Sequence, residues 1–334
     1  MIKIALRIGI RTAFQASVMI AACAASSVAT SAQPAWKPER TVEIVVGSAA
    51  GGGNDKAART LQRIWQEAKL LDNVTVVNKV GGGGALAYTY TNQTAGDAHR
   101  IVVARTGLLS NHILGLSPLN YADMTPLAVV ADETMALTVR TESSIKTSKD
   151  LTARWKTDPQ SVSISLGSSR GSTTHYTVAL LAKAVDVDPR RLKLLTFGGN
   201  AESITNLLGG HIDMTSGAIG QAIEHHKAGK MRVIGIATAK RSAQLPDVPT
   251  LREQGFDVIV PAWTALVGAK DLSPAQIAYW EGMLERAVNS PLWKGGLEED
   301  SVDWLFLKSQ ASRDYLRKDN DKIRVLLGEM GMTK

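Results

Sequence analysis

The sequence predicts an α/β protein of two lobes, with mostly parallel sheets and a central ligand cleft. One observation is a unit that recurs along the chain: a short β-branched run, a glycine-rich loop and an amphipathic helix. Strands that alternate with helices of about 10 to 15 residues are typical of βαβ units, in which the strands run parallel. The other observation is a pair of extended segments, 135–140 and 256–268, at which the chain could cross between lobes. Two lobes joined by two such segments can hinge around a cleft.

The predicted elements follow this unit in chain order. A strand at 41–46 leads into a helix that begins near Asp55. The apolar residues of that helix form one stripe, namely Ala57, Ala58, Leu61, Ile64, Trp65 and Ala68. The further strand and helix pairs are 74–80 with 85–95, 99–105 with 106–115, 161–166 with 176–185, 192–197 with 204–210, and 212–217 with 218–230, before a strand at 231–238. The tail from residue 273 is mostly helical, and it starts with Ser273 as a cap and Pro274 in the first turn.

The two crossings divide the chain into lobes. We expect lobe 1 to be discontinuous, with residues 33–138 and 259–334, and lobe 2 to consist of residues 139–258. Both lobes then contain βα units, so the carboxyl ends of their strands can face a common cleft.

The first 32 residues have the form of a signal peptide. Lys3, Arg7 and Arg11 precede an apolar stretch of small residues, and "TSA", ending at Ala32, resembles a cleavage site. "IAAC", ending at Cys23, also fits a lipoprotein box. We therefore expect export to the periplasm, either with cleavage after Ala32 or with an anchor through a lipidated Cys23.

Composition excludes several classes of protein. The chain of 334 residues is 44% hydrophobic and 21% charged, which is ordinary for a globular protein with two cores. No internal stretch approaches the roughly 18 apolar residues of a membrane span. Removing the three basic residues of the leader lowers the formal net charge from +7 to +4, and the other basic residues are interleaved with acids. We expect no nucleic-acid partner. The mature part has no cysteine and no H-x-x-x-H pair, so we expect no metal site.

Four loops rich in glycine, serine and threonine follow predicted strands, where the next helices begin. A helix N-terminus offers unpaired N–H groups and a partial positive charge, which favour an anion. The main fixed charges in these loops are Asp55, Lys79 and Arg170. Such a cleft suits a carboxylate. In the first loop, Asn54 and Asp55 either cap the helix or, in the case of Asp55, order the loop; the two roles are compatible.

An exported serine hydrolase is the alternative function. "GSSRG", residues 167–171, matches the G-x-S-x-G nucleophile elbow, with Ser169 as nucleophile and Asp213 with His225 or His226 as its partners. No His-Gly-Gly oxyanion loop precedes it, and we expect no catalysis. Nucleotide-binding patterns are incomplete as well, since neither G-x-G-x-x-G nor a P-loop occurs.

Two further residues have two interpretations each. His175, in the first turn of its helix, either faces the cleft or lies on the helix surface or at its cap. Trp263, in the second crossing, either packs between the lobes or contacts a ligand from the hinge.

Several segments together resemble the periplasmic solute-binding proteins of tripartite tricarboxylate transporters. The family's first loop, roughly Pro-Phe-x-Ala-Gly-Gly-x-x-Asp-x-x-x-Arg, resembles "GSAAGGGNDKAAR". The family's Val-x-Asn-x-x-Gly-x-Gly-Gly and Gly-Ser-x-Gly-x-x-x-His resemble "VVNKVGGGGALA" and "GSSRGSTTH". "LLGGHID" and "GKMRVIGIATAKRSAQLPDVPTLREQGF" are similar to later family segments, and the order holds over residues 41–330.

The resemblance implies a type II periplasmic-binding-protein fold that closes on a small carboxylate without catalysis or cofactor. It also implies delivery of the ligand to the membrane permease subunits of a transporter, and we expect the receptor to be a monomer. The implied ligand-binding residues are Ser48, Ala49, Gly51, Gly52, Asn54 and Asp55 in the first loop, Ser168, Ser172, Thr173 and His175 in the third, and Thr106, Gly198, Gly199 and Gly217 among the variable positions.

The chain departs from the family pattern at two places. Gly47 and Ser48 stand where the family often has Pro-Phe, so we expect the cleft to lack an aromatic wall and to be more polar. "GDAHR", residues 96–100, replaces the family's Asp-Gly-Tyr.

Overall fold

The computed structural model describes residues 36–167, 170–197 and 199–334, and residues 37–334 form one compact unit. The predicted leader, with Cys23 and Ala32, lies outside the described residues. Within the described ranges, no helix is both long enough and apolar enough to cross a membrane.

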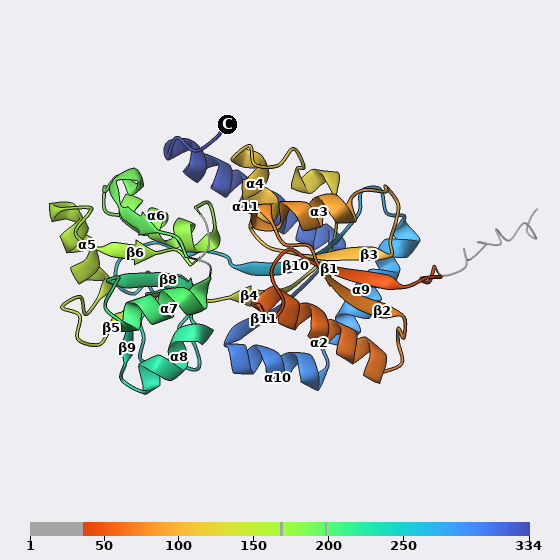
Figure 1. Cartoon of the computed structure of the whole chain (residues 1–334), viewed down its shortest axis with the longest axis horizontal. Coiled ribbons are helices and arrows are strands. Elements are labelled where there is room, and N and C mark those ends of the chain that lie inside the picture. Colours follow the sequence, from red (N-terminus) through yellow and green to blue (C-terminus); the bar gives the residue numbers. More distant parts are fainter. Residues whose placement is uncertain (1–35, 168–169, 198) are drawn as a thin grey trace, which may run out of the picture. The chain divides into compact units, whose positions relative to one another are not determined.

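Two sheets organise this unit (Figure 1). The larger has six strands in the order β11-β4-β10-β3-β1-β2. Its strands are β1 (Val42–Val46), β2 (Val74–Asn78), β3 (Arg100–Ala104), β4 (Thr125–Glu133), β10 (Trp263–Gly268) and β11 (Val302–Lys308). The smaller has five strands in the order β7-β6-β8-β5-β9. Its strands are β5 (Met135–Arg140), β6 (Ser163–Ser165), β7 (Lys193–Leu195), β8 (Met214–Ala218) and β9 (Met231–Ile236).

Helices pack against both sheets. Those that contact the larger sheet or each other beside it are α2 (Gly53–Glu67), α3 (Ala85–Thr91), α4 (Gly107–Ile113), α9 (Pro274–Val288), α10 (Pro291–Asp300) and α11 (Ser309–Glu329). Those of the smaller sheet are α5 (Ser148–Thr157), α6 (Thr173–Lys183), α7 (Asn200–Leu208) and α8 (Gly220–Lys227). Short 3₁₀ turns lie at Gly82–Gly84, Tyr121–Asp123 and Pro189–Arg191.

The α/β class and the two-lobed fold are confirmed, but the prediction of mostly parallel sheets is wrong. β1 pairs in parallel with β2 and β3, and β6 with β7 and β8. The pairs β10–β3, β10–β4, β11–β4, β5–β8 and β5–β9 are antiparallel. The repeated βα unit predicts only parallel strands, because the helix between two strands carries the chain back so that the next strand runs in the same direction. β4, β5 and β10 instead carry the chain from one sheet to the other, and β11 lies in the tail that we expected to be mostly helical.

The outward crossing lies at Thr134, the one residue between β4 and β5. The predicted lobe boundary between residues 138 and 139 falls inside β5, because the run "MALTVR" pairs with the smaller sheet from its first residue. The returning segment lies beside the crossing: Glu133 N–H donates to the Ala262 carbonyl at 3.1 Å, and Val260 N–H donates to Ala237 at 2.9 Å. We keep the division into two lobes as a proposal, with its outward crossing at Thr134.

The helix stripe predicted after the first loop is largely the buried face of α2. Ala58, Leu61, Ile64 and Trp65 are buried, whereas Ala68 is exposed just beyond the helix end. Trp65 packs 5.7 Å from Trp280, centroid to centroid, and donates its indole N–H to the Met283 carbonyl. This packing fixes α2, and therefore the loop before it, against the larger sheet.

Candidate functional site

Asp55 fastens the first glycine-rich loop. The buried carboxylate accepts the Gly51 N–H at 2.9 Å, Arg59 Nε at 2.8 Å and Asn78 Nδ2 at 2.9 Å. The hydrogen bond from Arg59 lowers the pKa of Asp55 to about 2; burial opposes this, and the bonds from Gly51 and Asn78 reinforce it. Asn78 Nδ2 also donates to the Ser48 carbonyl at 3.0 Å. The expectation that Asp55 orders the loop is confirmed.

Capping is not the role of Asn54 or Asp55. The N-cap of α2 is Gly52, and no side chain caps this helix. Asn54 Oδ1 instead accepts Arg105 Nε at 2.8 Å. Asn54 therefore positions Arg105, a cation that was not predicted among the charges of the site.

The third loop is held in the same way as the first. Gly171 N–H donates to His175 Nδ1 at 3.0 Å, and His175 is 1% exposed. In both loops the acceptor is the third residue of the helix, and the donor is a glycine four residues earlier with positive φ: 82° at Gly51 and 78° at Gly171. Such angles favour glycine. His175 is thus neither a surface residue nor a cap, but a buried anchor for its loop.

His175 is neutral near pH 7. Burial, reinforced by the charge of Arg170, lowers the pKa of His175 to about 4. Because Nδ1 accepts from Gly171, the proton of the neutral ring is on Nε2. This Nε2–H is buried and has no hydrogen-bond partner among the described residues.

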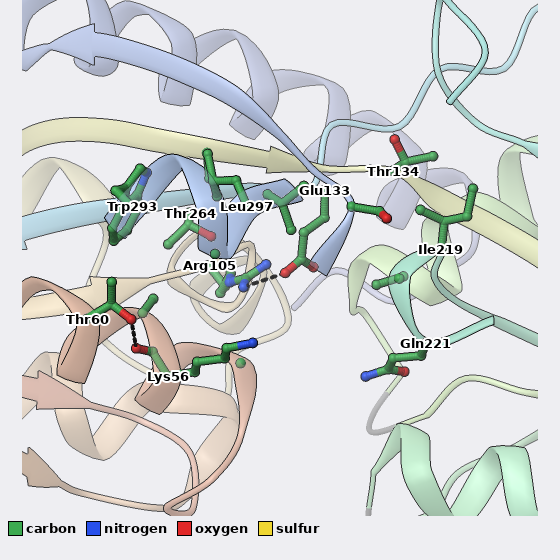
Figure 2. Close-up of a pocket in the computed structure, with 18 of the residues that line it drawn as sticks. Lys56, Thr60, Arg105, Glu133, Thr134, Ile219, Gln221, Thr264, Trp293 and Leu297 are labelled. Atoms are coloured by element: carbon green, nitrogen blue, oxygen red, sulfur yellow. Dashed lines mark hydrogen bonds and ion pairs between the residues drawn. The ribbon is translucent and has the colours of Figure 1, made fainter. Parts of the chain in front are cut away.

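A cavity of about 290 Å³ lies where both sheets contribute residues (Figure 2). From the larger sheet's side come Gly51, Gly53 and Arg105, and from the smaller sheet's side the segment 218–221 at the start of α8. Glu133 and Thr134, at the outward crossing, join the two sides. The remaining lining residues are Lys56, Ala57, Thr60, Ala131, Thr264, Trp293, Gly296, Leu297, Ser301 and Val302.

Arg105 and Glu133 form an ion pair in this cavity. Arg105 Nη2 donates to Glu133 Oε1 at 2.8 Å, and the two side chains are 25% and 22% exposed. Figure 2 shows the two groups joined by a dashed line, with Lys56 of α2 and Gln221 of α8 below them in this view. The cavity therefore holds fixed charges of both signs beside the start of α2.

Comparison of the sequence with models of known protein families identifies the family of this chain. A family model described as "Tripartite tricarboxylate transporter family receptor" matches residues 57–332. The chain belongs to this family. Receptors of this family are periplasmic solute-binding proteins, and the receptor is not an enzyme.

Curated relatives match most of the receptor's length. A protein of Cupriavidus necator, "UPF0065 protein in gbd 5'region", is 27% identical over 323 residues, which cover 94% of this chain and 96% of the relative. BugT of Bordetella pertussis is 26% identical over 260 residues, covering 76% of this chain and 77% of the relative.

Solved structures show the same fold. MatC from Rhodopseudomonas palustris, solved with bound malate, has a TM-score of 0.69 and 24% identity, covering 88% of this chain and 98% of MatC. A second R. palustris protein, solved with adipate, has a TM-score of 0.77 and 20% identity, covering 89% of this chain and 99% of that protein.

The remaining site residues of the receptor are distributed more widely than predicted. Thr106 and Thr173 contact each other, with their hydroxyl oxygens 2.8 Å apart, and so connect the N-cap of α4 with the start of α6. Ser172 and Thr174 have their hydroxyl oxygens 2.7 Å apart. Gly217 pairs with Ala136 inside the smaller sheet. Of the predicted residues that the structure describes, only Gly51 lines the cavity with Arg105.

Other predicted positions lie beside this group or outside the described residues. Ser48 Oγ is buried and has no partner among the described residues, while Ala49 is exposed. Gly52 and Gly199 are the N-caps of α2 and α7. Ser168, Ser169 and Gly198 are the predicted residues that the structure does not describe.

The second glycine run has a packing role. A Cβ at Gly47 would lie 2.8 Å from the Gly84 Cα, and a Cβ at Gly107 would lie 2.4 Å from the Gly83 carbonyl oxygen. Asn111 Nδ2 donates to the Gly82 carbonyl at 2.9 Å. We expected this loop to line the cleft, but it contributes no residue to the cavity described above. Lys79 likewise lies over the Tyr90 ring, 4.4 Å from its centroid.

The groups proposed for a hydrolase have other partners. Asp213 Oδ2 accepts Ser163 N–H at 2.8 Å and Ser163 Oγ at 2.6 Å, which joins β6 to the start of β8. His226 Nδ1 accepts Val233 N–H at 3.2 Å. Trp263 is fully buried and donates to Asp319 at 2.7 Å, so packing is its role. Within the described ranges no cluster of histidine, cysteine or acidic residues could hold a metal ion.

Three residues that sequence reasoning missed are Arg105, Glu133 and Gln221. Arg105 carried a signal, because it follows the apolar run "IVVA" at a strand end that was predicted to open on the cleft. Glu133 carried none, since the strand that ends there was not predicted.

Proposed function

We propose that the receptor binds a small organic carboxylate in the cavity between the two lobes and delivers it to the permease subunits of a tripartite transporter. The observation that carries the proposal is the set of anion-binding groups that line this cavity. Arg105 lines it together with the starts of α2 and α8, which no side chain caps. Uncapped first-turn N–H groups and a fixed guanidinium favour an anion.

Within the described ranges, side-chain caps occur at three other α-helices of the receptor, whereas α3, α4, α6, α7 and α11, like α2 and α8, have none. Thr147, Ser273 and Ser290 accept first-turn N–H groups of α5, α9 and α10. Ser or Thr at an N-cap stabilises a helix by about 1 kcal/mol relative to alanine, but only by a few tenths of a kcal/mol relative to glycine. Gly52, the N-cap of α2, has no side chain that could accept the first-turn N–H groups, so these donors stay available to a ligand.

A thermal-shift screen tests the binding. The panel contains di- and tricarboxylates, including malate and adipate, together with aromatic carboxylates and acidic amino acids. Because a ligand that binds only the folded state stabilises it by about 2.7 kcal/mol at a hundred times Kd, at least one compound should raise Tm. The matched control for each positive compound is its uncharged amide. No shift across the panel, or an equal shift with the amide, contradicts the proposal.

Export and delivery have separate tests. The pattern before residue 33 supports export, and mass analysis of the mature N-terminus distinguishes cleavage after Ala32 from a lipidated Cys23. Uptake of the stabilising compound by source cells with and without the receptor tests delivery. Equal uptake contradicts a role in transport.

A further inference from the structure

Arg105 is held rigidly in the cavity. Its Nε donates to Asn54 Oδ1 and its Nη2 to Glu133 Oε1, each at 2.8 Å, and its backbone N–H donates to the Tyr88 hydroxyl at 3.4 Å. A Cβ at Gly53 would come within 3.9 Å of Nη2, so the start of α2 lies next to the guanidinium. A side chain fixed at both ends of its guanidinium loses little further freedom when it binds a ligand.

The pair offers donors and an acceptor side by side. A guanidinium has five N–H donors, and in the described part of the chain one on Nε has its acceptor in Asn54 and one on Nη2 in Glu133. Glu133 uses Oε1 for Arg105, and its side chain is 22% exposed in the cavity. A ligand group that fits both must accept from Arg105 and donate to Glu133.

An unsubstituted carboxylate fits only half of this arrangement. It can accept from Arg105, but it brings a second negative charge toward Glu133, which costs free energy in a partly buried site. A carboxylate with a hydroxyl or ammonium group on the adjacent carbon accepts at one atom and donates at the next. Its donor then satisfies Glu133 in place of water.

We propose that Arg105 and Glu133 select a carboxylate that carries a hydroxyl or ammonium group on the adjacent carbon, over the unsubstituted carboxylate of the same length. This inference rests on the proposed function, because it assigns the ligand class of the same cavity. Glu133 is the residue that discriminates, and Arg105 is the residue that binds the carboxylate. Asn54 positions Arg105 without contacting the ligand.

Calorimetric titration of matched ligands tests the inference. The pairs are malate with succinate, aspartate with succinate, and 2-hydroxyglutarate with glutarate. The wild-type receptor should bind the substituted member of at least one pair tenfold or more tightly. Equal affinities within every pair overturn the inference, while binding of any of these compounds leaves the proposed function standing. Absence of binding by every compound, and by the wider panel above, contradicts both.

Two variants identify the residues responsible. Glu133→Gln keeps the shape but removes the charge, and it should reduce the preference for the substituted ligand about tenfold. Glu133→Ala removes the same carboxylate and leaves Arg105 in place, so it keeps the test valid if the Gln variant folds poorly. Glu285→Gln is the control, since Glu285 pairs with Lys308 on an exposed surface away from the cavity lining. An unchanged preference in both Glu133 variants overturns the inference.

Discussion

Asp55 and His175 show how one residue sets the conformation of a loop. Each is buried at the third position of a helix and accepts the N–H of a glycine four residues earlier. One acceptor is a carboxylate and the other a neutral imidazole. The shared requirement is an acceptor at this position, because the glycine N–H otherwise lies at an uncapped helix start without a protein partner.

Asp55→Asn should lower the free energy of unfolding by about 1 to 3 kcal/mol. The amide has one acceptor oxygen instead of the carboxylate's two and no charge to pair with Arg59, so at least one of the three donors around Asp55 loses its acceptor. Urea denaturation at pH 7 measures this change. We also expect weaker binding of any carboxylate found in the screen, since the first loop is no longer fixed.

Glu67→Gln on the same helix is the matched control. Glu67 pairs with Arg63, and both side chains are more than half exposed, so its loss should change stability by no more than about 0.5 kcal/mol. Similar effects of the two substitutions would contradict the anchoring role of Asp55.

At the level of elements, the two glycine runs near the N-terminus have different roles. The first supplies Gly51 and Gly53 to the cavity. In the second, all four glycines from Gly81 to Gly84 have positive φ, and the run packs against Gly47 and α4. The second run thereby packs against Gly47, just before the first run, and this contact leaves no room for a side chain at residue 47.

Gly47→Ala should destabilise the receptor by about 1 to 3 kcal/mol. The new Cβ would meet backbone, the Gly84 Cα at 2.8 Å, and backbone cannot move aside as a flexible side chain can. The change should also weaken carboxylate binding, because the first loop must shift. Thermal denaturation and calorimetry measure the two effects.

For Gly282→Ala we expect the opposite effect, an increase in stability. Gly282 lies inside α9, and a Cβ there meets nothing within 4 Å. Alanine should therefore stabilise the receptor by about 0.5 to 1 kcal/mol, since it reduces the backbone entropy lost on folding. If Gly47→Ala also stabilises, the contact between the two loops is not as described.

For the whole molecule, buried ionisable groups give opposing pH effects. Asp132 precedes the outward crossing and accepts the Ala262 N–H at 2.7 Å. Burial raises the pKa of Asp132 to about 6; the Ala262 bond opposes this, and the charges of Asp303, Asp319 and Glu133 add to it. The folded state therefore favours a protonated Asp132 and, as shown above, a neutral His175.

The signs follow from these pKa values. His175 titrates near 4 in the folded state and near 6.5 unfolded, so its contribution is present above pH 6.5 and is lost as pH falls toward 4. Asp132 titrates near 6 folded and 3.8 unfolded, so it adds stability as pH falls through 6 toward 3.8. Between pH 7 and pH 4.5, each group changes the free energy of unfolding by an amount on the order of 2 kcal/mol, and the two changes largely cancel in the wild type.

Single substitutions should reveal the two contributions. Between pH 7 and pH 4.5, the free energy of unfolding of Asp132→Asn should fall by about 2 kcal/mol more than that of the wild type. His175→Asn, whose side-chain oxygen can replace Nδ1 as acceptor for Gly171, should lose about 2 kcal/mol less. Urea denaturation at both pH values measures these differences, and parallel pH profiles of all three proteins would refute the assignment.

The sequence predicted much of the framework but few contacts of the site. The stripe on α2 and the buried Trp65 were predicted from local spacing, and Asp55 was predicted as a loop anchor from its position at the helix start. Arg105 and Glu133 are 28 residues apart, and their contact depends on how β3 and β4 are placed in the sheet. Nothing local to either residue encodes that placement.

By itself, the sequence determined that this protein is built from strand, loop and helix units, and that its glycine-rich loops follow strand ends. Helix and strand periods are local properties of the backbone and of the residues that must be buried. Only the tertiary structure decided the direction of β4, β5 and β10, the packing of one glycine run behind another, and the meeting of Arg105 with Glu133. These features depend on contacts between distant segments, whose free energies exist only after the chain has folded back on itself.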